Sequence, residues 1–163
     1  MTELDFLSPD GCDSDVVLTS PLARIDGAGV VTDVSGLGKL EVRGDIDALE
    51  TVSGEHLVPI GEGRALLVMH GSPAAARVRL RASGYRVYDV TAALAAFELE
   101  GEDLLRRLTE LDLRALPAVG SIARGTPAVI ERQEGERFRL FVPQELGHFA
   151  AEVALDMAKG LSR

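Results

Sequence analysis

The sequence has a single cysteine and few aromatic residues. The one cysteine, Cys12, cannot form a disulfide within the chain, and its acidic surroundings offer no cation that would activate the thiol. Tryptophan is absent, and aromatic residues make up only 4% of the chain. Proteins that stack the bases of single-stranded nucleic acids need aromatic platforms. The composition therefore argues against that class and predicts an aliphatic core.

Basic residues are also in short supply. Lys and Arg number 17 against 26 Asp and Glu, which gives a formal net charge of -9, and such a charge repels a phosphate backbone. The clearest basic cluster consists of Arg77, Arg79 and Arg81. We expect these arginines to lie on the solvated face of a helix. The alternative is a docking face for an acidic partner.

Long apolar runs and targeting signals are missing as well. No run approaches the roughly 20 apolar residues of a membrane span, and residues 1–15 lack the basic and apolar regions of a signal peptide. We expect a flexible acidic tail over 1–15, which is rich in Asp, Ser and Gly. A short apolar run at 16–18 is long enough for a strand. These features predict a cytoplasmic protein.

The most informative feature of the sequence is an internal repeat. Residues 33–45 open with Asp-Val-Ser and residues 89–102 open with Asp-Val-Thr. Each copy continues with a spacer, an alternating strand, and a glycine followed by an acidic residue. Further on, the apolar runs 64–69 and 137–142 match each other, and each precedes a predicted helix. Two matches in the same order predict a duplicated unit.

Alternation of apolar and charged residues predicts the strands. Leu40 and Val42 alternate with charged neighbours, as Phe97 and Leu99 do, so one face of each strand is expected to be buried. The remaining expected strands span residues 64–69, 85–90 and 128–132, and a last one begins at 137 after a hairpin turn at 134–135.

Three helices are expected. Ser72 as N-cap and Pro73 at the first helical position begin one helix, and Gly84 ends it. A second begins with two acidic residues at 102–103, which suit the positive end of a helix dipole, and the last runs from about 144 to 159. The apolar stripes of the three helices are expected to be Ala74, Val78 and Ala82; Leu104, Leu105, Leu108 and Leu111; and Leu146, Phe149, Ala150, Val153 and Met157.

Together these elements predict an α+β protein made of two similar halves. Helices would cover one face of an antiparallel sheet in each half, as in duplicated ferredoxin-like (split βαβ) units. After the tail at 1–15, we expect a first α+β half at 16–84 and a second at 85–163, joined into one compact unit. Each half is expected to run strand, helix, strand, helix, with an extra hairpin strand in the second.

Residues that commonly carry catalysis are scattered along the sequence. His56, His70 and His148 are not paired with each other or with Cys12 at metal-ligand spacing, so no zinc site is expected. Structural or surface roles are expected for all three. A charged cluster at the end of the second helix is predicted to form surface ion pairs, with a grip on a carboxylate ligand as the alternative. It consists of Arg106, Arg107, Asp112 and Arg114.

Asp33 and Asp89 hold matching positions in the repeat. Paired carboxylates can act as acid and base. Each of these aspartates, however, lies two residues before a hydroxyl residue, Ser35 or Thr91, at a strand end. Aspartates in that setting commonly bind local backbone N–H groups, and neither hydroxyl has a histidine at a spacing diagnostic of nucleophilic catalysis. We therefore name no catalytic or metal-binding residue.

The order of short motifs in the second half carries a family resemblance. The motifs are Asp-Val-Thr at 89–91, Phe-Glu-Leu-Glu-Gly at 97–101, Leu-Leu at 104–105, Leu-Asp-Leu at 111–113 and Leu-Pro at 116–117. They are followed by Ala-Val-Ile at 128–130, Arg-Leu-Phe-Val at 139–142 and a helix from Phe149 to Ala158, and preceded by Ser-Pro-Leu at 20–22. Over about residues 20–160, this order is similar to that of the gamma subunit family of heterotetrameric sarcosine oxidase.

The resemblance implies the fold of the folate-binding aminomethyltransferase (glycine-cleavage T-protein) superfamily. It also implies a small, non-catalytic subunit of a flavoprotein complex that oxidises sarcosine to glycine. FAD, FMN, NAD and tetrahydrofolate are then expected on the larger partner subunits and not on this chain. The alternative is a stand-alone folate-binding module, in which Asp89 or Glu98 would bind the pterin. The catalytic aspartate context of true T-proteins is missing, which argues against a free-standing aminomethyltransferase.

Overall fold

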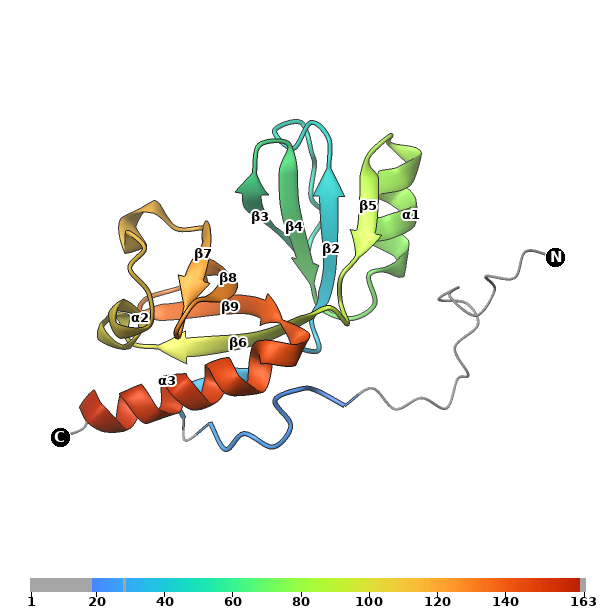
Figure 1. Ribbon diagram of the computed structural model, residues 1–163. Coiled ribbons are helices and arrows are strands. Elements are labelled where there is room, and N and C mark those ends of the chain that lie inside the picture. Colours follow the sequence, from blue (N-terminus) through green and yellow to red (C-terminus); the bar gives the residue numbers. More distant parts are fainter. Residues whose placement is uncertain (1–18, 28, 162–163) are drawn as a thin grey trace.

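The computed structural model describes residues 19–27 and 29–161. The predicted tail at 1–15, which contains Cys12, and the apolar run at 16–18 lie outside the described residues. The described residues form two antiparallel sheets and three α-helices (Figure 1), which confirms the α+β class. None of the helices in this part of the chain is both long and apolar enough to cross a membrane.

The two sheets run in different directions. In Figure 1 the strands of the four-stranded sheet stand upright above the strands β6 and β9 of the five-stranded sheet, which lie across the view. The five-stranded sheet has the order β1 (Val31–Asp33), β6 (Leu94–Glu100), β9 (Arg137–Pro143), β8 (Thr126–Arg132), β7 (Ala118–Ile122). The four-stranded sheet has the order β3 (Glu55–Gly61), β4 (Arg64–Met69), β2 (Gly38–Arg43), β5 (Arg86–Asp89).

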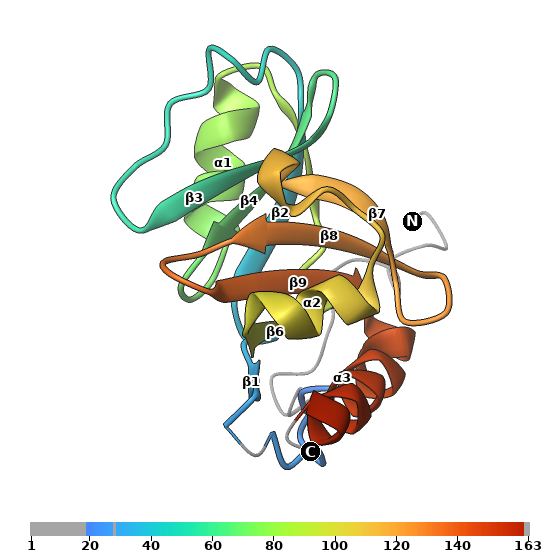
Figure 2. The same ribbon diagram turned by 90° about the vertical axis from the view of Figure 1, so that its left-hand side faces the viewer.

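Each sheet has helices on one face only. Helix α1 (Ala74–Ala82) packs on the four-stranded sheet, while α2 (Glu102–Leu108) and α3 (Gly147–Leu161) pack on the five-stranded sheet (Figures 1 and 2). The opposite faces of the sheets meet each other, because alternate strand residues point to opposite faces. This third, inter-sheet core contains Leu37, Val58, Leu66, Val68, Ala96 and Phe141.

Most predicted strands are confirmed. β2, β4, β5, β6, β8 and β9 lie where the sequence predicted strands, and the hairpin turn between β8 and β9 has Gly135 at a φ of 66°. Three strands were not predicted: β1, β3 and β7. β3 contains Pro59 and β7 contains Gly120, which weaken a strand signal. The helix expected after the first strand of the first half is wrong, because residues 44–54 form a loop that leads from β2 to β3.

Two helices present a different face from the one predicted. Helix α1 buries Ala76 and Leu80 and leaves Val78 69% exposed. Both stripes have helical spacing, so only the docking of the helix on the sheet distinguishes them. Helix α3 follows a short 3-10 turn at Gln144–Leu146, and Phe149 is 40% exposed.

Small residues bring α3 close to the sheet. The buried face of α3 consists of Gly147, Ala150, Ala151 and Ala154. A Cβ atom at Gly147 would lie 2.5 Å from the Cβ of Ala95 in β6, which is closer than packed atoms tolerate. Helix α2 ends at Leu108, earlier than the predicted stripe, because Thr109 is extended (φ -141°, ψ 152°). Leu111 instead packs beside Gly120.

The repeated Asp-Val-Ser/Thr segments mark the two places where the chain crosses from one sheet to the other. After β1, the Val34 N–H donates to the Ala96 carbonyl of β6 (3.0 Å) before the chain enters β2. After β5, the Val90 N–H donates to the Lys39 carbonyl of β2 (2.9 Å) before the chain enters β6. Each crossing connection therefore extends the strand it leaves by one further hydrogen bond.

The hydroxyl residues complete this arrangement. The Ser35 hydroxyl accepts from the Ala96 N–H and donates to the Ala96 carbonyl, both at 3.1 Å. The Thr91 hydroxyl does the same with Lys39, at 3.0 and 3.3 Å. Asp33 and Asp89 accept the N–H groups of Ser35 (2.9 Å) and Thr91 (3.0 Å), which confirms the local role expected for them.

We predict that Ser35→Ala and Thr91→Ala each lower the free energy of unfolding by about 1–3 kcal/mol, the cost of a buried backbone group left without a partner. Ala96 and Lys39 are both fully buried, so water does not replace the lost hydroxyl. Urea denaturation measures the change. Ser35→Thr and Thr91→Ser retain a hydroxyl and serve as matched controls. Losses below ~0.5 kcal/mol, typical of surface positions, would contradict the structural role.

Candidate functional site

The junction between the sheets holds a buried cation. Lys39, one of the two lysines in the sequence, has no exposed surface. Its Nζ donates to the carbonyls of Ser35 (2.7 Å) and Leu37 (2.9 Å), which belong to the first crossing connection. The ammonium thus satisfies backbone groups that water does not reach. Sequence reasoning missed this burial, since a lysine at the start of an amphipathic strand usually faces solvent.

Burial lowers the pKa of Lys39 from 10.5 to about 8, and the carboxylates of Asp33 and Asp89 oppose this effect. The charged form is disfavoured because it leaves water, and the two aspartates recover part of that loss. A lysine with such a pKa can act as a base or nucleophile when it is accessible. Lys39 is enclosed, so its role is to hold the connection.

A row of charged side chains lies on the face of the five-stranded sheet that looks toward the other sheet. Arg139 of β9 donates to Glu98 of β6 (2.8 and 3.1 Å) and to Glu131 of β8 (3.1 Å). These three residues are direct cross-strand neighbours. The other oxygen of Glu131 lies 2.6 Å from Nε2 of His56 in β3. The row therefore joins the two sheets at the edge of the inter-sheet core.

Both residues considered for pterin binding are engaged within the chain. Glu98 is bound by Arg139, and Asp89 accepts the N–H of Thr91. Neither residue lines either of the two surface depressions described below. A ligand would have to displace Arg139 in order to reach the Glu98 carboxylate.

The pairing of His56 with Glu131 is the arrangement that most resembles a catalytic one. Glu131 is 2% exposed, whereas the His56 side chain is 57% exposed, so a buried carboxylate orients an accessible imidazole as in hydrolytic triads. A triad also needs a nucleophile bonded to the imidazole. Over the described residues, no Ser, Thr or Cys side chain is hydrogen-bonded to His56. The pair ties β3 to β8 instead.

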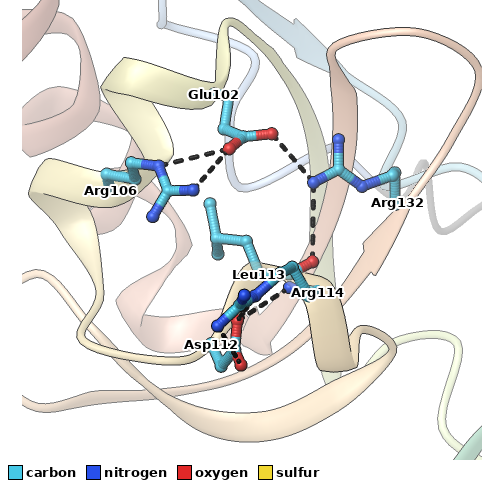
Figure 3. Close-up of polar contacts among 6 residues, drawn as sticks. All are labelled: Glu102, Arg106, Asp112, Leu113, Arg114 and Arg132. Atoms are coloured by element: carbon cyan, nitrogen blue, oxygen red, sulfur yellow. Dashed lines mark hydrogen bonds and ion pairs between the residues drawn. The ribbon is translucent and has the colours of Figure 1, made fainter.

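The charged cluster around α2 forms surface ion pairs, as predicted (Figure 3). Glu102 lies between Arg106 (2.6 Å) and Arg132 (2.9 Å), while Arg114 pairs with Asp112 at 3.1 Å. The Arg106 and Arg132 guanidinium groups lower the pKa of Glu102, with Arg132 the larger influence. Arg132 also reaches the Leu113 carbonyl. Arg106, Arg114 and Arg132 are each paired with an acid of the chain itself.

Two of the three arginines of α1 are structural, which corrects the prediction of a purely solvated face. Arg79 donates to both oxygens of Glu55 (2.6 Å each) at the outer strand β3. Arg81 donates to the Val87 carbonyl of β5 (3.1 Å), on the opposite edge of the sheet. Capping an edge carbonyl also blocks pairing with foreign strands. The helix is therefore attached to both edges of its sheet.

The remaining histidines do not form a site. His70 is exposed, and His148 pairs with Glu152 at 3.3 Å on α3. His148 and Arg24 line two shallow depressions of about 360 and 320 Å³ between α3 and the segment 19–26. Among the described residues, no three His, Cys, Asp or Glu side chains are grouped to hold a metal.

Lys39 provides a test of the buried junction. Because its folded pKa lies below its unfolded pKa, the unfolded state binds more protons between pH 8 and 10.5. We predict that the stability of the wild type relative to Lys39→Met rises over this interval and is level below it. NMR of the protein labelled with ¹³C-lysine should show Lys39 titrating near pH 8. Lys159→Met, at an exposed position, is the control, and a Lys39 midpoint near 10.5 would contradict the prediction.

Arg139 provides a test of the charged row. We predict that Arg139→Met lowers the free energy of unfolding by about 3 kcal/mol, because it leaves Glu131 buried without its strongest partner. His56→Ala removes only an exposed partner of the same carboxylate and should cost less than ~1 kcal/mol. Thermal and urea unfolding measure both. Equal effects of the two substitutions would show that the arginine does not hold the row together.

Comparison with known proteins agrees with the fold described above. No protein-family model and no curated protein sequence matches the chain. Among solved structures, the chain is similar to a chain of the "Heterotetrameric Sarcosine Oxidase from Corynebacterium sp. U-96 in complex with pyrrole 2-carboxylate". The TM-score is 0.72 at 17% sequence identity, over 90% of this chain and 97% of that chain. The motif order in the sequence and the three-dimensional similarity thus point the same way, and the chain has the fold of a chain of heterotetrameric sarcosine oxidase.

Proposed function

We propose that the chain is a gamma-type, non-catalytic subunit of a heterotetrameric sarcosine oxidase-like flavoprotein complex, which demethylates sarcosine oxidatively to glycine in a folate-linked reaction. The observation that carries the proposal is the fold match. It covers 90% of this chain and 97% of one chain of such an oxidase, at a TM-score of 0.72. The ordered motifs between residues 20 and 160 support the same assignment.

The polar side chains at the junction and in the charged row are bonded to other groups of the chain, which supports a non-catalytic role. Lys39 is enclosed, Glu98 is bound to Arg139, and the Glu131 carboxylate is shared by Arg139 and His56. Groups that perform chemistry must reach a substrate, whereas these groups reach one another. On this proposal, FAD, FMN, NAD and tetrahydrofolate belong to the partner subunits, and the assembly is cytoplasmic.

The sheet crossings support descent from a duplicated unit of the aminomethyltransferase type. The two Asp-Val-Ser/Thr segments make equivalent bonds to Ala96 and Lys39, which occupy corresponding positions at the start of β6 and β2. We assign the two copies to ferredoxin-like halves, of which the first has lost the helix after its first strand. The stand-alone folate-binding alternative is less well supported, because its candidate residues Asp89 and Glu98 are already bound.

The proposal predicts co-purification with a flavoprotein. When the full chain is tagged and expressed in its native host, we expect a yellow complex with flavin absorbance that forms peroxide when sarcosine is added. An unrelated acidic protein with the same tag is the control. A colourless protein that elutes alone would refute the subunit assignment. Titration with tetrahydrofolate would then test the alternative, which requires measurable binding.

A further inference from the structure

The face of the four-stranded sheet that is opposite α1 is only partly covered. Near the junction, Val58, Leu66 and Val68 on this face are buried against the five-stranded sheet. At the far end of the strands, the same face carries exposed residues, among them Tyr88, which is 46% exposed. No described element lies over this end, since α1 packs on the other face.

Three arginines form a row across this exposed end. Arg43 of β2 lies directly opposite Arg64 of β4 on one side and directly opposite Arg86 of β5 on the other. Like charges in directly opposed positions destabilise a sheet. The row is therefore a costly arrangement for the isolated chain, and it is all the more unusual in a protein whose formal net charge is -9.

A single carboxylate pairs with two of the three arginines in the row. Glu41 accepts from Arg43 at 2.7 Å and from Arg64 at 2.9 and 3.1 Å. Among the described residues, Arg86 has no ion-pair partner. Asp45, which follows β2, accepts the N–H of Ala48 in its own loop. The row thus has three positive charges against the single negative charge of Glu41.

The row is also held in position. The Arg43 guanidinium lies 5.0 Å from the centre of the Tyr88 ring, a cation–π contact, and Glu41 fixes both Arg43 and Arg64. Arginine and tyrosine are the residues most enriched where protein surfaces meet. Guanidinium groups that are already oriented lose little freedom when they bind a carboxylate, and they match its geometry in pairs.

We propose that this surface, the arginine row Arg43, Arg64 and Arg86 with Tyr88, is the docking site for an acidic segment of a partner subunit. The proposal rests on the proposed function, because it names the surface through which this chain joins its complex. Carboxylates of the partner neutralise the positive charge that Glu41 leaves unmatched. The acidic remainder of the chain disfavours the same segment elsewhere, so charge sets the orientation of docking.

A defined probe tests the charge recognition without the complex. The full chain is titrated into a fluorescein-labelled peptide of eight glutamates, and binding is followed by anisotropy at low salt. The double variant Arg64→Gln/Arg86→Gln should bind about tenfold more weakly, a loss of about 1.4 kcal/mol. The control Arg107→Gln/Arg124→Gln removes the same number of charges from exposed positions outside the row and should bind as the wild type does. No binding by the wild type, or equal loss in both variants, overturns the proposal.

A variant that binds the peptide more tightly would distinguish a docking site from a cluster of ion pairs that only stabilises the sheet. Glu41→Gln releases Arg43 and Arg64, so the variant should bind the glutamate peptide several-fold more tightly than the wild type. If Glu41 exists only to stabilise the sheet, the variant will be less stable but will bind no better, which overturns the proposal. A third outcome is that the wild type binds no peptide but self-associates, and that only Arg64→Gln/Arg86→Gln abolishes this self-association. The face would then bind a second copy of the chain, and the proposal would be overturned.

The complex itself distinguishes this inference from the proposed function. The tagged variants are expressed in the native host as described above, and the flavin retained on each is measured. Loss of flavin with Arg64→Gln/Arg86→Gln but not with Arg107→Gln/Arg124→Gln supports the docking site. Equal flavin on both refutes the docking site while the subunit assignment stands. Absence of flavin from the wild type refutes the assignment, and the peptide result then decides whether the row binds acidic segments.

Discussion

Two stretches of backbone cross between the sheets at a partly buried junction, and the polar groups that are buried there must find partners. The rest of the structure depends on how this constraint is met. Ser35 binds both backbone groups of Ala96, Thr91 binds both backbone groups of Lys39, and the Lys39 ammonium binds two carbonyls of the first crossing. These bonds fix the two crossings beside the inter-sheet core, which holds the sheets together through apolar contacts.

Outside the junction, charged side chains also bind other groups of the same chain. Arg139 holds two glutamates on one sheet, and His56 reaches Glu131 from the other sheet. Arg79 and Arg81 attach α1 to the two edges of its sheet. Most arginines near the sheets are thus bound by the chain's own acids or carbonyls. The row on the open face is different, since Glu41 pairs with only two of its three arginines, Arg43 and Arg64. This excess of positive charge is what marks the row as a surface for another molecule.

In the described part of the protein, the buried polar side chains are bonded to other groups of the same chain. A buried polar side-chain atom without a hydrogen-bond partner is not found among the described residues, and such atoms often mark a place where a ligand belongs. The chain shares its fold with a chain of heterotetrameric sarcosine oxidase. The subunit role proposed above is consistent with an interior in which the polar groups bind one another.

The sequence by itself determined the local elements and the crossing motifs. Period-two alternation placed β2 and β6, and short apolar runs bounded by turn residues placed β4, β5, β8 and β9. The Asp-Val-Ser/Thr repeat identified the turns in which Asp33 and Asp89 bind the backbone. These features depend only on neighbouring residues. Strands β1, β3 and β7 were not predicted. β1 has only three residues, and Pro59 in β3 and Gly120 in β7 weaken the sequence signal of those strands. Such strands form because a partner strand is available.

Only the tertiary structure decided which faces are buried and which charges meet. Leu80 and not Val78 faces the sheet, and Gly147 with its neighbouring alanines replaces Phe149 as the contact face of α3, since both choices have the same helical period. Lys39 is buried where the two sheets meet, and Arg139 pairs with Glu98, which lies 41 residues away in the sequence. The free energies of both arrangements depend on desolvation and on partners that only the fold brings together. Neither can be read from a pattern of neighbouring residues.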